Sequence, residues 1–155
     1  MTKPLEKIVI NVGLGRASQL PQFKDKVLPE IMQELALISG QKPAPRQAKK
    51  AIAGFKTRVG DIIGLQTTLR GKLMNDFFKR LVNIILPRVK DFRGLDLKNV
   101  DGNGILNIGF REQFVFPEIK IEQSKVAFGV QVTIVPNLRG RSKAIDLYRS
   151  LGVPL

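Results

Sequence analysis

Residues 63–89 read IGLQTTLRGKLMNDFFKRLVNIILPRV, and this stretch places the clearest helix of the chain directly after a strand. In Ile63–Arg70, apolar and polar side chains alternate, which is the two-residue period of a strand that buries one face. After Gly71 the period changes to three or four residues, which predicts a helix over Leu73–Val89. The side chains predicted to face the core are Leu73, Phe77, Leu81, Ile84 and Ile85.

The same alternation recurs three more times and predicts three further strands. These are Lys7–Val12, Leu106–Phe110 and Val130–Val135. No internal repeat or long linker divides the chain, so we expect a single domain over residues 1–155. Strands interspersed with helices predict an α+β fold, with a mainly antiparallel sheet, helices packed on one face and the other face free for a partner.

Two shorter helices complete the expected fold. One covers Glu30–Ile38 and ends at Gly40, a residue that commonly terminates helices. Pro29 is expected to open this helix, and the alternative is a longer helix that Pro29 kinks. The other helix covers Lys143–Leu151, and Ser142 is expected to cap it.

The composition indicates a folded protein with a polyanionic partner. The 155 residues carry 26 Lys and Arg against 13 Asp and Glu, a net charge of +13. This balance favours nucleic acid first and an acidic membrane second. A membrane span is not expected, because no apolar run approaches the roughly 20 residues that a bilayer requires. The first residues lack a long signal-peptide core, so the cytoplasm is the expected compartment.

The residue types needed for several kinds of catalysis and metal binding are absent. The chain has no Cys and no His, which excludes disulfides, histidine acid–base chemistry and Cys/His zinc sites. Gly13–Ser18 begins like a dinucleotide-binding motif but lacks its third glycine, and Asp101–Gly104 is a tight turn rather than a calcium loop. No pair of carboxylates has a spacing that indicates acid–base catalysis. We therefore expect no enzymatic activity, no cofactor and no metal.

The segment Gly40–Gly60, GQKPAPRQAKKAIAGFKTRVG, contains six basic residues and no acidic one. Like charges at this density repel one another and are stabilised by a polyanion. Phe55 adds an apolar ring that suits stacking; the alternative is that it anchors the core. Lys49 and Lys50 could equally be solvated surface. We expect a basic loop at about residues 46–63 to protrude from the domain.

The polar sides of the four predicted strands share an unusual composition. None of their side chains is acidic, whereas a solvated sheet face usually mixes Glu and Lys. Uncharged donors and acceptors together with arginine suit sugar hydroxyls and phosphates. The alternatives are that helices cover both faces or that the polarity is incidental. The predicted face comprises Asn11, Gln66, Thr68, Arg70, Asn107, Arg111, Gln131 and Thr133.

Five colinear blocks carry a specific family resemblance. They are KIVINVGLG (7–15), ISGQKP (38–43), AKKAIAGFKTRVGDIIGLQTTLRG (48–71), PRVKDFRGL (87–95) and DGNGILNIGFREQFVFPEI (101–119). These blocks resemble the bacterial-type ribosomal protein L-five family, the 5S rRNA-binding proteins of the large ribosomal subunit. The match weakens after Ile119. The family usually has an additional helix before the first strand, and its acidic stretch after the last strand is basic here, at residues 136–141.

The resemblance implies a protein that binds 5S rRNA and helps to mount it in the central protuberance, with the free sheet face on the RNA. The 5S rRNA contacts are implied at Asn11, Gln41, Thr68 and Arg70. The predicted face adds Gln66, Gln131 and Thr133 as further contacts. The basic loop is implied to reach the P-site tRNA through Lys49, Lys50, Phe55, Lys56 and Arg58.

The resemblance also implies several other partners. These are 23S-type large-subunit rRNA, other central-protuberance proteins, and the small-subunit protein S-thirteen across an intersubunit bridge. No membrane partner is expected, and the ribosome would be cytoplasmic, with an organellar ribosome as the alternative. The rival function is a general RNA- or DNA-binding protein outside the ribosome, which the lack of interleaved aromatics on the strands disfavours. A nucleic-acid-modifying enzyme is disfavoured by the absence of His and Cys.

Overall fold

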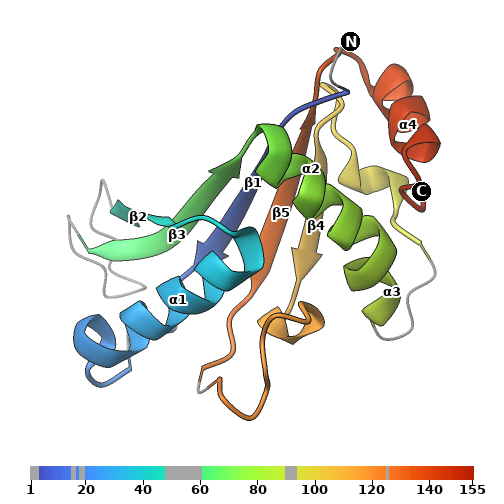
Figure 1. The fold of residues 1–155 in the computed structure, drawn as a ribbon. Helices are drawn as coiled ribbons and strands as arrows, with labels where there is room; N and C mark the ends of the chain where they lie inside the picture. The colour runs from blue at the N-terminus through green and yellow to red at the C-terminus, as the bar shows by residue number, and fades with distance from the viewer. Residues whose placement is uncertain (1–3, 15–16, 18–19, 48–60, 90–93, 125) are drawn as a thin grey trace. The chain divides into compact units, whose positions relative to one another are not determined.

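The computed structural model describes residues 4–14, 17, 20–47, 61–89, 94–124 and 126–155 (Figure 1). Within these residues, five strands are hydrogen-bonded in the order β2-β3-β1-β5-β4. The strands are β1 (Leu5–Gly13), β2 (Ala44–Gln47), β3 (Ile62–Leu69), β4 (Leu106–Phe110) and β5 (Val130–Pro136). The helices are α1 (Leu28–Ser39), α2 (Gly71–Arg80), α3 (Leu86–Arg88) and α4 (Arg141–Ser150).

Neighbouring strands run antiparallel, as the arrows in Figure 1 show. β2 pairs with β3 in antiparallel register. The end of β1 lies beside the start of β3, where the Leu14 N–H donates to the Ile63 carbonyl at 2.9 Å. The residue after β5 lies beside the start of β1, where the Asn137 N–H donates to the Pro4 carbonyl at 2.9 Å. The predicted α+β fold with an antiparallel sheet is confirmed.

The four predicted strands are present, and each buries the predicted face. In β1, Ile8, Ile10 and Val12 are at most 1% exposed, while Val9 and Asn11 are half-buried. From Leu65 onward in β3 and throughout β5, buried residues alternate in the same way with half-buried or exposed ones. One face of each strand therefore joins the core, and the opposite face keeps partial contact with solvent. We call this second side the open face.

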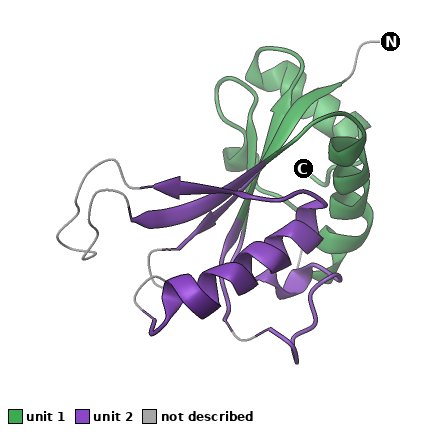
Figure 2. Cartoon of the chain, turned by 60° about the vertical axis from the view of Figure 1, so that its left-hand side comes forward, with its two compact units in different colours: residues 1–9, 68–109, 131–155 green, residues 10–67, 110–130 purple. Residues whose placement is uncertain are grey.

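The described chain forms two compact units (Figure 2). Unit 1 comprises residues 1–9, 68–109 and 131–155, and unit 2 comprises residues 10–67 and 110–130. Unit 2 buries the apolar side of α1 together with the core side of the strand segments that it contains. Unit 1 buries α2 and α4 side chains with its own strand segments. The single domain expected over residues 1–155 stays a prediction.

The helix after β3 buries a somewhat different face from the predicted one. It continues from α2 through a π-helical turn, η4 (Leu81–Ile85), into α3. Leu73 and Ile84, both predicted to face the core, are 41% and 45% exposed. Leu73 adjoins Met74 and Ile84 adjoins Ile85, and the helical period alone does not decide which member of an apolar pair points inward. The buried side chains are Met74, Phe77, Phe78, Leu81, Ile85 and Leu86.

Helix α1 ends as predicted but begins differently. Gly40 adopts a left-handed φ of 78°, and its N–H donates to the Ala36 carbonyl at 2.8 Å. Pro29 is the second residue of α1, and a π-helical turn, η2 (Phe23–Val27), precedes it. The helical path therefore starts earlier than predicted. Pro29 has no backbone N–H, so it cannot form the regular helical hydrogen bond to the turn before it. This accounts for the irregular geometry of that turn.

Helix α4 is present, but its predicted cap is wrong. The helix begins at Arg141, with Gly140 as the N-cap residue and no side-chain cap. Ser142 lies inside the first turn, where its hydroxyl is past the capping position. The preceding strand, β5, ends at Pro136, and a short connection links it to the helix. Gly140, the last residue of this connection, occupies the N-cap position that was predicted for Ser142.

The turn predicted at Asp101–Gly104 is confirmed, and its last residue, Gly104, is buried in unit 1. Asp101 accepts N–H bonds from Asn103 and Ile105 through one carboxylate oxygen, each at 2.9 Å. The Tyr148 hydroxyl, buried in α4, donates to the Gly104 carbonyl. Burial raises the pKa of this phenol above its usual range, so the hydroxyl remains a neutral donor at any ordinary pH.

Gly104→Ala is expected to destabilise the protein by about 2–3 kcal/mol, because of strain and overpacking. Gly104 has a left-handed φ of 88°, and an added Cβ would lie 2.6 Å from the Cβ of Ala144. Gly102→Ala is the matched control, since an added Cβ there meets nothing within 4 Å. Urea unfolding monitored by circular dichroism measures both variants. Equal unfolding midpoints for the two would contradict the role assigned to Gly104.

Candidate nucleic-acid interface

In unit 2, the open face is assembled from β1, β2 and β3. The β2–β3 register places Arg46 opposite Gly64 and Ala44 opposite Gln66. The Arg46 Nε–H donates to the Gln66 amide oxygen at 2.6 Å, so both side chains lie on the open face. Asn11 is half-buried on β1, on the side away from the core. Two predicted contact residues, Asn11 and Gln66, therefore belong to this face.

Arg46 is a cation of this face that was predicted only as part of the basic segment. Proline favours extended backbone in the residue before it, and Pro43 and Pro45 stand at the start of this segment, where the structure has β2. The sequence signal that β2 joins the sheet was weak, because β2 has four residues, all exposed, and no alternation. Its pairing with β3 is what brings Arg46 to Gln66.

In unit 1, the open face has a hydrogen-bonded polar cluster. The Thr133 hydroxyl donates to the Asn107 amide oxygen at 2.8 Å, and the Gln131 amide lies 3.4 Å from the same oxygen. These bonds orient the three side chains, and Gln131 remains exposed. Thr68 is half-buried on β3, and Arg70, which follows it at the start of α2, is exposed. Unit 1 therefore presents four of the predicted contacts, Thr68, Arg70, Gln131 and Thr133.

From Lys7 onward in β1 and throughout β3, β4 and β5, no open-face position carries a carboxylate. The alternating open-face positions of β1, β3, β4 and β5 carry Asn, Gln, Thr, Gly, Lys and aliphatic residues. Glu6, at the start of β1, is the one exposed carboxylate within these strands, and it follows the buried Leu5. The open face can therefore approach phosphates without repulsion from its own strands.

Gln41 is positioned by the end of α1. Ser39 is buried, and its hydroxyl oxygen lies 2.9 Å from the Leu35 and Gln41 carbonyls. The same oxygen accepts the Gln41 N–H at 3.2 Å. With Gly40 in the left-handed region, these bonds define the backbone at Gln41, whose side chain is exposed. The backbone of Gln41 is thus held at a defined point shortly before β2.

The basic loop is described only at its two ends. Gln47 lies opposite Ile62 at the base of the β2–β3 pair. The residues predicted to face a tRNA lie in 48–60, outside the described residues. They are Lys49, Lys50, Phe55, Lys56 and Arg58.

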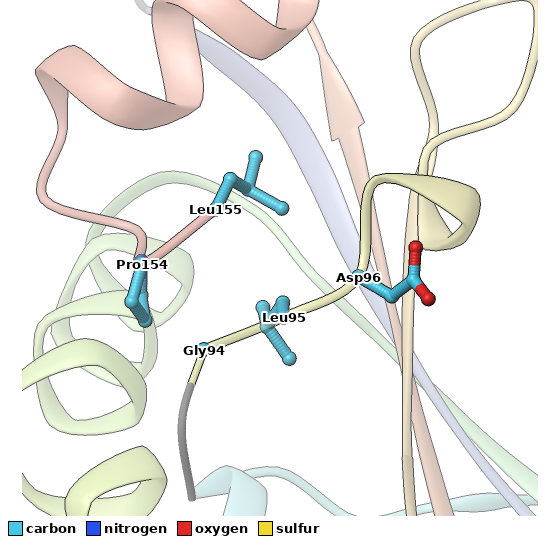
Figure 3. Close-up of a pocket in the computed structure, with 5 residues that line it drawn as sticks. All are labelled: Gly94, Leu95, Asp96, Pro154 and Leu155. Carbon is cyan, nitrogen blue, oxygen red and sulfur yellow. The ribbon is translucent and has the colours of Figure 1, made fainter.

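The remaining surface of the described residues offers little for other chemistry. A shallow depression of about 370 Å³ lies in unit 1 between Gly94–Asp96 and the last two residues, Pro154 and Leu155 (Figure 3). Its one ionisable side chain, Asp96, already accepts the Lys98 N–H at 2.9 Å. The described residues include no cluster of three or more potential metal ligands. None of their helices combines the length and the apolar character needed to cross a bilayer.

Two models of one protein family match consecutive segments that together span almost the whole chain. Residues 1–58 match the family model described as Ribosomal protein L5, and residues 62–155 match the ribosomal L5P family C-terminus. The match to the family therefore continues beyond Ile119 and through the C-terminal quarter of the chain.

Several curated bacterial proteins named large ribosomal subunit protein uL5 are similar over nearly the whole chain. The protein from Leptospira biflexa is 45% identical over 150 residues, which are 97% of this chain and 80% of that protein. The protein from Halothermothrix orenii is 44% identical with shares of 97% and 82%, and that from Mycoplasma pneumoniae is 47% identical with the same shares. This family consists of ribosomal proteins and not of enzymes. With both family models matched and this level of identity, the chain belongs to the ribosomal protein L5 family.

Proposed function

We propose that this chain, a structural and non-enzymatic protein of the large ribosomal subunit, binds 5S rRNA through the open face of its sheet and helps to form the central protuberance. Large-subunit rRNA of the 23S type and other central-protuberance proteins are its further neighbours. The ribosome that contains it is cytoplasmic.

The polar, acid-poor open face is the observation that carries this proposal. Asn, Gln and Thr side chains donate and accept hydrogen bonds, which suits ribose hydroxyls and base edges. Arg46 and Arg70 add positive charge that neutralises phosphates and releases counterions. The hydrogen bonds of Arg46 to Gln66 and of Thr133 to Asn107 hold these groups in place before RNA arrives. A preorganised polar surface loses less side-chain entropy on binding.

The basic loop between β2 and β3 is proposed to reach the P-site tRNA. Its support is the charge pattern, since residues 40–60 carry six cations and no acid. The antiparallel β2–β3 pair brings the two ends of the loop together at Gln47 and Ile62.

A different surface is proposed to meet the small-subunit protein S-thirteen in an intersubunit bridge. Residues 112–124 of unit 2 carry Glu112, Glu118 and Glu122 against one cation, Lys120. Ile121 is 62% exposed within this segment. Carboxylates repel phosphates, so an acidic segment with an exposed aliphatic side chain suits a basic protein better than RNA.

The general nucleic-acid binder outside the ribosome is the alternative, and a binding comparison separates the two functions. The chain is expected to bind 5S rRNA at least about 100-fold more tightly than duplex DNA of equal length at the same moderate salt. Filter binding or fluorescence anisotropy measures both affinities. Comparable affinities would contradict specific 5S rRNA binding, since counterion release alone does not discriminate between two polyanions.

A further inference from the structure

Unit 1 carries a cluster of cations at the start of α4, on the segment that follows β5. Arg139, Arg141 and Lys143 lie within five residues, all three are exposed, and the segment 136–143 contains no acid. We call these three residues the α4 patch. They do not belong to the open face, because they follow the end of β5 at Pro136.

Arg141 is held in place by two backbone carbonyls. Its Nε–H donates to the Val100 carbonyl at 3.1 Å, and its Nη2 donates to the Leu97 carbonyl at 2.9 Å. A guanidinium has five N–H groups, so three remain for a ligand. Carbonyl acceptors orient the side chain without neutralising its charge. The side-chain entropy that a phosphate contact usually costs has therefore already been lost on folding.

Two carboxylates in the segment that Arg141 contacts accept backbone N–H groups. Asp96 accepts the Lys98 N–H, and Asp101 accepts the N–H groups of Asn103 and Ile105. The first acid of α4 itself, Asp146, comes more than one turn after the helix start. Lys98, in the turn that Arg141 contacts, adds a further exposed cation.

The cations also stand at the end of α4 that electrostatics disfavours for them. Partial positive charge gathers at a helix N-terminus, where acids stabilise and cations destabilise. The first turn of α4 has no acid and no side-chain cap. This arrangement is unfavourable in the isolated protein and becomes favourable when a polyanion covers it.

We propose that the α4 patch binds backbone phosphates of ribosomal RNA, as a second RNA contact separate from the open face. The inference rests on the proposed function, because it takes RNA as the polyanion that this protein meets. The group that the α4 patch binds is the phosphodiester. It belongs to either 5S rRNA or large-subunit rRNA. The alternative partner is an acidic protein. In that case the experiment below would show no RNA cleavage from position 142.

Directed hydroxyl-radical cleavage tests the proposal in reconstituted large subunits. The natural chain has no Cys, so Ser142→Cys provides a unique attachment point for an iron–EDTA probe beside the α4 patch. A second variant, Gly109→Cys, places the probe on the open face, where an added Cβ meets nothing within 4 Å. The expected result is RNA cleavage from both positions, and the RNA cut from position 142 identifies the source of the phosphates.

The two positions separate this proposal from the proposed function. Cleavage from position 109 without cleavage from position 142 overturns the α4 patch and leaves the open-face interface intact. Absence of 5S rRNA cleavage from position 109 overturns the open-face interface itself. Asp25→Cys, on the exposed π-helical turn of unit 2, controls for untargeted radicals.

A salt titration provides a second test. It measures the affinity of the protein for the rRNA that is cleaved from position 142. Arg139→Gln combined with Lys143→Gln is expected to lower the slope of log affinity against log salt by about 2 and to weaken binding about 50-fold at 0.1 M salt. Lys24→Gln combined with Lys26→Gln removes the same charge from exposed positions of unit 2. Equal slopes for the two double variants would overturn the proposal, since net charge alone would then explain the effect.

Discussion

Combining Thr68→Val with Arg70→Gln is expected to weaken 5S rRNA binding by about 60- to 700-fold. Arg70 is exposed at the start of α2, and in the proposed interface its charge-assisted contact would contribute about 1.5–3 kcal/mol. Thr68 adds a hydroxyl worth about 1 kcal/mol, and every 1.4 kcal/mol is a tenfold change in affinity. Fluorescence anisotropy with labelled 5S rRNA at constant salt measures the loss.

A loop variant serves as the comparison for this prediction. Phe55→Ala with Lys56→Gln and Arg58→Gln removes two charges from the basic loop and leaves the strands untouched. This variant is expected to retain 5S rRNA binding within a few-fold and to impair tRNA-dependent translation. If the loop variant lost 5S rRNA binding as severely as the strand variant, the proposed division between the open face and the loop would be wrong.

Gln113→Leu is expected to destabilise the protein by about 3–5 kcal/mol. Gln113 is fully buried in unit 2, and its amide nitrogen lies 2.7 Å from the Val126 carbonyl and 3.2 Å from the Glu34 carboxylate. Its amide oxygen accepts the Phe128 N–H at 3.0 Å. Leucine has a similar size but leaves these buried groups without partners, including a carboxylate that is only 9% exposed.

Gln123→Leu is the matched control, because Gln123 is exposed and belongs to the same segment. It is expected to change stability by no more than about 0.5 kcal/mol, as is usual for surface substitutions. Urea unfolding of the two variants is the measurement. An effect below about 1 kcal/mol for Gln113→Leu would show that water or a local rearrangement satisfies the buried groups.

The regular elements could be predicted from the sequence because each has a strong period. Ile8, Ile10 and Val12 are buried as the alternation of β1 indicated, and the same holds for Leu65 and Leu69 in β3. The open face followed from the same alternation, since a strand that buries one side presents the other. Asn11, Gln66 and Thr133 were therefore located on it without knowledge of the strand order.

The missed features depend on contacts between residues far apart in the chain. Arg46 joins the open face only because β2 pairs with β3, and its partner Gln66 is twenty residues away. The bond of Gln113 to Glu34 spans 79 residues, and no local pattern predicts the burial of Gln113 or this pairing. The helical period is compatible with burial of either Leu73 or Met74. The prediction that Leu73 faces the core was therefore wrong, because Met74 is the buried residue.

The sequence by itself determined the fold class, the polar composition of the open face, the cationic segment and the family. Each of these depends on local period, local charge or colinear residue blocks, which need no knowledge of neighbours in space. Only the tertiary structure decided the strand order, the place of Arg46, the burial of Gln113 and the anchoring of Arg141. These follow from hydrogen bonds and packing between distant segments, and such contacts form only once the chain has folded.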